Sequence, residues 1–214
     1  MGVRSQVTAN CIHCGHAQAV DTFLSVNVAE EPELRDRVRD GSLFLWECEA
    51  CGGSSLVRSS CLYHDPGRKL MIWLLEGGAV DEAKLAATAD ELPDYTLRRV
   101  SDVGSLIEKV KIFDASLDDR VMEMCKWVSR QELADSMPEQ KPEILAAPFK
   151  FFRMEGADND LILSFPLDGK MMSVRVGFHV YEDCRGILQR HADVLSSLRG
   201  FARVDADWIA SLMR

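Results

Sequence analysis

Two short cysteine pairs carry the clearest chemical signal in the sequence. Residues 10–15 read NCIHCG and residues 47–52 read ECEACG, so each pair is spaced Cys-x-x-Cys and is followed by a glycine. Two such turns supply four thiolates, the ligand set that tetrahedral zinc prefers, and the glycine permits the positive φ angle of a tight knuckle. We therefore predict a zinc site formed by Cys11, Cys14, Cys48 and Cys51.

A site of this kind is structural, because four cysteines leave no coordination position open for water or substrate. The alternative is a redox Cys-x-x-Cys, but that motif usually occurs once and in a βαβ setting. His13 lies inside the first pair and His16 shortly after it, and both can in principle bind metal, although the four cysteines already complete a tetrahedron. The segment between the two pairs is longer than the loop of about 15–20 residues in a minimal zinc ribbon, which an inserted strand–helix–strand explains.

Other polar residues suggest chemistry less strongly. Tyr63-His64-Asp65 is a possible acid–base set, yet an aspartate before Pro66-Gly67 commonly stabilises a turn. Asp118-Asp119 is a possible carboxylate pair, yet acidic residues also favour the first turn of a helix. Neither a nucleophilic triad nor a phosphate-binding loop is identifiable, so we predict no catalytic residues.

Composition limits the possible functions. The net charge is -9, and basic residues are scattered rather than clustered, which disfavours nucleic-acid binding. The chain has no apolar run of about 18 residues and no apolar core for a signal peptide, so we expect no membrane span and a cytoplasmic location. The number of cysteines is 7, an odd number that argues against a disulfide framework. We expect Cys61, Cys125 and Cys184 to be small buried hydrophobic residues.

Hydrophobic patterning predicts an α+β fold in two parts. In the first, a strand over 17–28, a helix over 31–40 and a strand over 42–48 lead to a hairpin that turns at residues 65–68. This part, residues 1–76, is expected to be a zinc-ribbon β module with an inserted helix. Gly77-Gly78 is the expected boundary. The second part, residues 80–214, is expected to mix helices with three strands, at 149–154, 161–165 and 171–178, and to include a helix over 180–198, a short strand from Phe201 and a last helix capped by Asp205.

Several segments together resemble the CpXC family of bacterial proteins. They are CIHCG, CEACGG, the intervening EPELRDRVRDGSLF, then LYHDPGRKLMIW, LIEKVKIFDASLDDRVMEMCKW and the final FARVDADWIASL. The sequence departs from the family in having Ile12 where the family has a proline after the first cysteine. The resemblance implies a zinc-binding N-terminal module and implies no particular reaction.

These observations favour a non-enzymatic protein-interaction or scaffold module with a structural zinc ion. The identity of its protein partner and its oligomeric state are not predictable from the sequence. One alternative is an enzyme whose pocket lies between the two modules and uses His64 and Asp65. The other is nucleic-acid binding through the ribbon, which needs a basic face around Arg4, Arg58 and Arg68.

Overall fold

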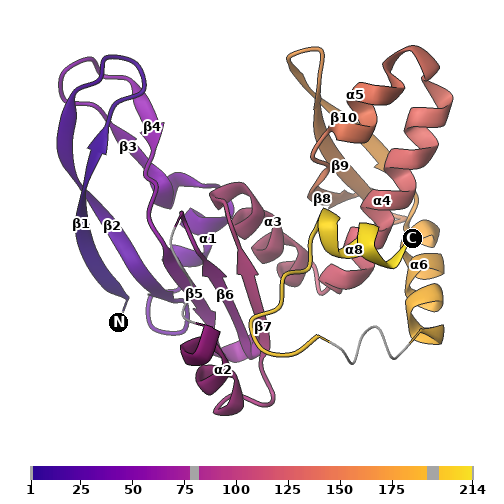
Figure 1. Cartoon of the computed structure of the whole chain (residues 1–214), viewed down its shortest axis with the longest axis horizontal. Coiled ribbons are helices and arrows are strands. Elements are labelled where there is room, and N and C mark those ends of the chain that lie inside the picture. Colours follow the sequence, from indigo (N-terminus) through magenta and orange to yellow (C-terminus); the bar gives the residue numbers. More distant parts are fainter. Residues whose placement is uncertain (1, 78–81, 192–197, 214) are drawn as a thin grey trace. The chain divides into compact units, whose positions relative to one another are not determined.

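The chain folds into two compact units. The computed structural model describes residues 2–77, 82–191 and 198–213 (Figure 1). The N-terminal unit comprises Met1–Ile107 with Arg199–Arg203, and the C-terminal unit comprises Glu108–Leu198 with Val204–Arg214. Both units contain helices and strands, which confirms the mixed α/β class. The division lies inside a helix, not at the expected Gly77-Gly78, of which Gly78 is outside the described residues.

A five-stranded sheet organises the N-terminal unit. Its strands run in the order β1 (Val3–Asn10), β2 (Ala17–Asn27), β5 (Cys61–Asp65), β6 (Leu70–Leu74) and β7 (Thr96–Val100). β2 pairs with β5 and β6 with β7 in parallel, whereas the β1–β2 and β5–β6 pairs are antiparallel. The pairing of β7 with β6 explains why this unit continues beyond the predicted boundary. β1 was not anticipated from the sequence.

The predicted hairpin at residues 65–68 is confirmed. A short 3-10 helix, η2 (Pro66–Arg68), joins β5 to β6, and the Asp65 carboxylate caps it by accepting a hydrogen bond from the backbone N–H of Arg68. Lys69 then adopts a positive φ of 49°, which lets the chain turn back into β6. The Asp-Pro-Gly sequence therefore forms the tight turn between two strands that its residue types predict.

A separate two-stranded ladder lies next to the β1–β2 hairpin in the same unit. It pairs β3 (Leu45–Glu47) with β4 (Ser54–Leu56). In the chain, α1 (Glu33–Arg39) and the 3-10 helix η1 (Ser42–Phe44) lie between β2 and β3. The strand predicted over 42–48 is thus a 3-10 turn followed by a three-residue strand. We call the β1–β2 and β3–β4 hairpins, with the loops that join their strands, the cysteine arm (Figure 1).

The two faces of the five-stranded sheet have different coverings. On one face, Tyr63 and Ile72 are almost fully buried, and α1 is tied to β5 by an ion pair between Arg35 and Asp65. On the other face, Met71 and Trp73 pack with Phe201 and with buried residues of β7 and of α2 (Glu82–Asp90). The strand expected from Phe201 onward is reduced to an isolated bridge between Arg98 and Ala202.

The C-terminal unit has its own core between helices and a three-stranded sheet. The helices are α3 (Val103–Asp114), which begins in the N-terminal unit, then α4 (Asp119–Ser136), α5 (Lys141–Ala146), α6 (Phe178–Arg190) and α8 (Ala206–Leu212). The short 3-10 helix η3 (Pro138–Gln140) lies between α4 and α5. The antiparallel sheet has the order β10 (Lys170–Val176), β9 (Asp160–Leu167), β8 (Lys150–Glu155), and these are the three predicted strands. The helix predicted over 180–198 ends at Arg190, and 192–197 lie outside the described residues.

Capping and helical periodicity account for α4. The Asp118 carboxylate accepts a hydrogen bond from the N–H of Arg120, and the expected apolar stripe, which includes Val121, Met124 and Cys125, is buried in the core. Asp205 caps α8 in the same way, by accepting from the N–H of Trp208. Within the described residues, no helix has the length and apolar character needed to cross a membrane.

Candidate metal centre

The two cysteine loops are built on the same hydrogen-bond pattern. In the loop between β1 and β2, the Cys11 N–H donates to the His16 carbonyl at 2.8 Å, and the Gly15 N–H donates to the Cys11 carbonyl at 2.9 Å. In the loop between β3 and β4, the Cys48 N–H donates to Gly53 and the Gly52 N–H to Cys48, at 3.0 and 2.8 Å. Both turns need a left-handed residue just after the second cysteine, which explains the trailing glycines.

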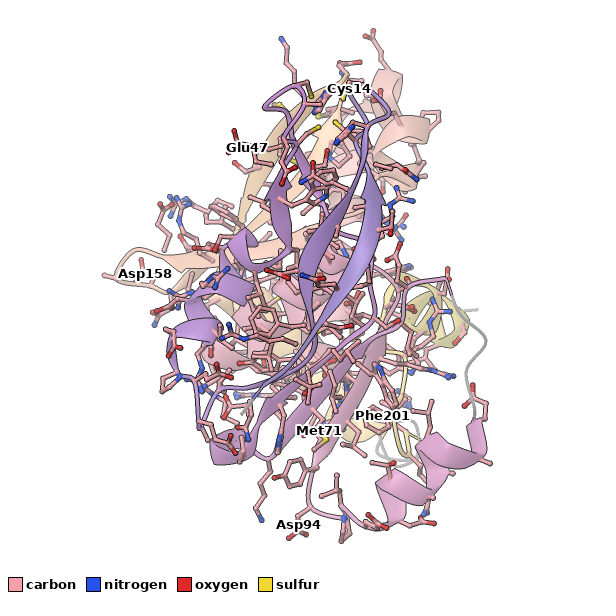
Figure 2. All side chains as sticks on the ribbon, turned by 90° about the vertical axis from the view of Figure 1, so that its left-hand side faces the viewer. Cys14, Glu47, Met71, Asp94, Asp158 and Phe201 are labelled. Atoms are coloured by element: carbon pink, nitrogen blue, oxygen red, sulfur yellow. The ribbon has the colours of Figure 1, made fainter. Side chains whose placement is uncertain are left out.

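The four cysteines converge at the end of the cysteine arm, where Figure 2 labels Cys14. Their sulfur atoms all lie within 4.8 Å of one another. The Cys11 and Cys51 sulfurs are 3.6 Å apart, and those of Cys14 and Cys48 are 3.7 Å apart. A tetrahedral ion with metal–sulfur bonds of about 2.3 Å requires sulfur–sulfur distances of about 3.8 Å. The four thiols thus form a cluster that can hold a metal ion.

Electrostatics within the cluster favour a cation. Burial tends to raise the pKa of Cys11, but hydrogen bonds from the N–H groups of His13 and Cys14 and from neighbouring thiols outweigh it and lower the pKa to about 6. At Cys51 the N–H of Gly53 acts to lower the pKa, but the adjacent thiols raise it to about 12. Like charges at this separation oppose one another, so a bound cation is what permits all four thiolates to form.

Side chains outside the cluster fix one hairpin of the arm against the other. The Gln18 amide nitrogen donates to the carbonyl of Glu47 at 3.2 Å, and the Gln18 amide oxygen accepts from the N–H of Glu49 at 2.9 Å. The His13 ring lies 3.2 Å from the carbonyl of Ser54. Neither His13 nor His16 belongs to the metal-compatible group found among the described residues. The role of Gln18 was not anticipated, because a single glutamine in a strand gives no signal in the sequence.

His64 and Asp65 do not form an acid–base pair. They are successive residues of β5, whose side chains alternate between the two faces of the sheet. The buried Asp65 carboxylate accepts hydrogen bonds from Arg35 at 2.6 Å and from the Arg68 guanidinium at 3.1 Å. The His64 ring lies 3.3 Å from the Tyr95 hydroxyl, and burial lowers the pKa of His64. A surface hollow of the N-terminal unit, lined by α2, Arg99 and residues 199–202, includes neither residue.

Asp119 and a second carboxylate, Glu108, belong to a buried charge network in the C-terminal unit. Glu108 and Lys109 lie on α3, Asp119, Glu123 and Lys126 on α4, and Lys150 on β8. Lys126 binds Glu108 and Glu123, both at 2.8 Å, and Lys109 binds Asp119 at 2.9 Å. Three acids face three lysines, so the network is balanced. Asp119 is therefore an ion-pair partner of Lys109 as well as a residue of the first turn of α4. Asp118 is the N-cap of the same helix.

These observations define a mixed α/β protein that carries a four-cysteine, metal-compatible centre on two matched loops. The CpXC protein family model matches residues 9–126, which include all four cysteines and more than half of the chain. The chain belongs to the CpXC family. Searches of curated proteins and of solved structures found no match.

Proposed function

We propose that the chain is a zinc-ribbon protein that acts as a non-enzymatic protein-interaction or scaffold module. The observation that carries the proposal is the agreement between the sulfur–sulfur distances, 3.6 and 3.7 Å, and those of a tetrahedral four-thiolate zinc site. Cys11, Cys14, Cys48 and Cys51 are the proposed ligands. Zinc bound there cross-links two hairpins that are otherwise joined by few side chains.

The proposed zinc ion is structural rather than catalytic. Activation of water by zinc requires an open coordination position, and four thiolates fill the tetrahedron. The ion therefore contributes folding energy, on the order of 10 kcal/mol in small zinc modules. A cytoplasmic location belongs to the same proposal, because all seven cysteines are free thiols and the cytosol keeps thiols reduced.

Zinc content tests the metal part of the proposal. Protein purified without chelator is expected to contain about one zinc per chain by elemental analysis, because one four-cysteine centre binds one ion. Cys48→Ser is expected to lose most of it, whereas Cys61→Ala, which removes a buried thiol outside the cluster, is expected to retain it. Full zinc content in Cys48→Ser would contradict the assignment of the ligands.

The surface of the cysteine arm supports the interaction part of the proposal. Five large apolar side chains of the arm are exposed by about half or more: Val3, Ile12, Leu24, Leu45 and Leu56. Of these, Leu45 and Leu56 are paired across β3 and β4, and adjacent exposed apolar side chains are typical of protein-binding surfaces. Cross-linking in cell extract, followed by mass spectrometry, is expected to join a partner protein to residues of the arm. A chain that forms no cross-links through the arm would contradict this role.

The two alternatives receive less support. An enzyme based on His64 and Asp65 needs the two side chains to act together, and they face opposite sides of β5. Nucleic-acid binding needs clustered cations, whereas Arg4 pairs with Glu31 and Arg68 pairs with Asp65. We therefore expect His64→Gln to leave the biological activity of the folded, zinc-loaded protein intact.

A further inference from the structure

The β3–β4 ladder has one buried side and one exposed apolar side. Trp46 and Ser55 are paired on the inner side and are 8% and 4% exposed. Leu45 and Leu56 are paired on the other side and are 53% and 54% exposed. Glu47 follows Leu45 by two residues and therefore lies on the same side, which we call the outer β3–β4 face: Leu45, Glu47 and Leu56.

The exposure of this leucine pair has no explanation in the packing of the arm. The inner side already supplies the contacts that bury Trp46, so the fold of the arm does not require leucine on the outside. Directly opposed apolar side chains in an antiparallel ladder form a single continuous patch. Solvent contact with this patch costs free energy that a partner would recover by covering it.

Charge specifies which kind of partner fits. The sequence has no lysine or arginine from Ser5 to Leu34 or from Asp40 to Val57, and these two ranges contain both cysteine loops. Glu47 and Glu49 are both exposed and have no ion pair within the described part of the chain. Figure 2 shows Glu47 near the end of the arm that carries Cys14. Four thiolates around a zinc ion add a net charge of about −2 there.

We propose that the outer β3–β4 face docks a basic segment of a partner protein, in which an aliphatic side chain covers Leu45 and Leu56 and a flanking lysine or arginine pairs with Glu47. This inference rests on the proposed interaction function and specifies the partner's chemistry. Leu45 and Leu56 supply the apolar contact, and Glu47 sets the orientation of the bound segment and its preference for positive charge.

Two other occupants fit the surface less well. A second copy of the chain, placed on the same face by a two-fold axis, would bring the Glu47 carboxylates of both copies into one interface, and the stretch from Asp40 to Val57 that contains this face has no lysine or arginine to pair with them. A nucleic acid would bring phosphates against the same acids. A basic protein segment is the occupant that satisfies both the apolar pair and the charge.

A random-peptide phage library selected on the immobilised, zinc-loaded full chain tests the proposal. The selected peptides are expected to combine lysine or arginine with an aliphatic residue. Their dissociation constants, measured by fluorescence polarisation with labelled peptides, are expected to rise about tenfold in Leu45→Ser and in Leu56→Ser. Glu47→Lys is expected to weaken binding further and to reduce its dependence on salt, because a screened attraction becomes a repulsion.

Matched controls separate docking from folding. Leu24→Ser removes an apolar side chain of similar exposure, 49%, from the other hairpin and is expected to bind the peptides as the original chain does. Glu182→Lys reverses an exposed acid of the C-terminal unit, and the same result is expected. If Leu45→Ser lost zinc, the conservative Glu47→Gln would carry the test, with an expected loss of binding of about threefold.

The outcomes distinguish this inference from the function on which it rests. Peptides that are acidic, or that bind the face variants and the original chain equally, would overturn the inference, as would preferential binding of a random oligonucleotide pool. If cross-linking in extract still joined a partner to the arm, the interaction function would stand without the outer β3–β4 face. If neither experiment yielded a partner, both would fail.

Discussion

Replacement of Glu108 by glutamine is the sharpest test of how the C-terminal unit is held together. The Glu108 carboxylate is 3% exposed and accepts hydrogen bonds from Lys126 at 2.8 Å and from the N–H of Phe151 at 2.7 Å. It also lies 3.3 Å from the ammonium group of Lys150. Glutamine keeps the shape and can still accept from Phe151, but it leaves three lysines facing two acids in the buried network.

The expected cost follows from that imbalance. Removal of one partner from a buried ion pair typically destabilises a protein by about 3–5 kcal/mol, because the other charge stays buried. Because glutamine retains the hydrogen bond from the N–H of Phe151, we expect Glu108→Gln to lower the free energy of unfolding by about 3 kcal/mol, at the lower end of that range. Lys126→Met should destabilise the protein by a similar amount, because it leaves three buried acids facing two lysines. The double variant restores the charge balance, so we expect it to cost less than the sum of the single variants by about 2 kcal/mol.

Urea denaturation measures the free energy of unfolding of the original chain, the two single variants and the double variant. Hydrogen exchange of α3, α4 and β8 then reports on this unit alone. The matched control is Glu182→Gln, which breaks a 3.6 Å pair with Arg185 in which both side chains are at least half exposed. It is expected to cost less than about 1 kcal/mol. A cost of Glu108→Gln as small as that of the control, or strict additivity in the double variant, would refute the reasoning.

The same network predicts a pH dependence. Burial acts to raise the pKa of Glu108, but Lys126, Lys150 and Lys109 outweigh it and hold the pKa below its ordinary value of 4.5. The stabilisation from this group is therefore complete above about pH 4.5 and is lost as the pH falls through the lowered pKa. The stability difference between the original chain and Glu108→Gln should shrink in that acidic range. A difference that stayed constant down to acid unfolding would contradict the ion-pair explanation.

Three further predictions concern the N-terminal unit. Chelation of the proposed metal ion should raise hydrogen exchange in β1–β4 far more than in α4 and β9, because that ion would cross-link the two hairpins of the cysteine arm. Uniform loosening of the chain would contradict this. Asp65→Asn should destabilise the N-terminal unit by about 2 kcal/mol in urea denaturation, because it removes the buried carboxylate that accepts charge-assisted hydrogen bonds from Arg35 and Arg68, and a neutral result would contradict that. Cys61 should resist alkylation in the folded protein, because burial raises its pKa to about 12, and rapid labelling at pH 8 would contradict that burial.

Sequence patterns predicted local features better than contacts between distant segments. The Cys-x-x-Cys-Gly turns, the hairpin at Asp65 and the cap at Asp118 were all predictable, because each depends on a few neighbouring residues. β1 was missed because its side chains are mostly exposed and show little alternation of apolar residues. The extent of the N-terminal unit was missed because it depends on the parallel pairing of β7 with β6. No local pattern encodes such a pairing.

The charge network shows the same limit for side chains. Glu108 and Lys109 resemble an ordinary solvated helix surface in sequence, and only the packing of α3 against α4 and β8 buries them. At the candidate metal centre, by contrast, spacing alone predicted which four cysteines come together, since each turn holds two of them. What the spacing did not reveal is Gln18, whose amide joins the first hairpin to the backbone at Glu47 and Glu49.

The cysteine arm and the C-terminal unit differ in the interactions that stabilise them. The cysteine arm consists of two hairpins, and a two-stranded hairpin in water is at best marginally stable on its own. Its buried side chains are few, so a metal ion held by the four cysteines would provide stability that a larger core otherwise supplies. The C-terminal unit has a continuous core and uses ion pairs to fix α3, α4 and β8 in one arrangement. In the proposed function, an arm stabilised by metal needs no large apolar interior, so its outer leucines, Leu45 and Leu56, can contact a partner instead.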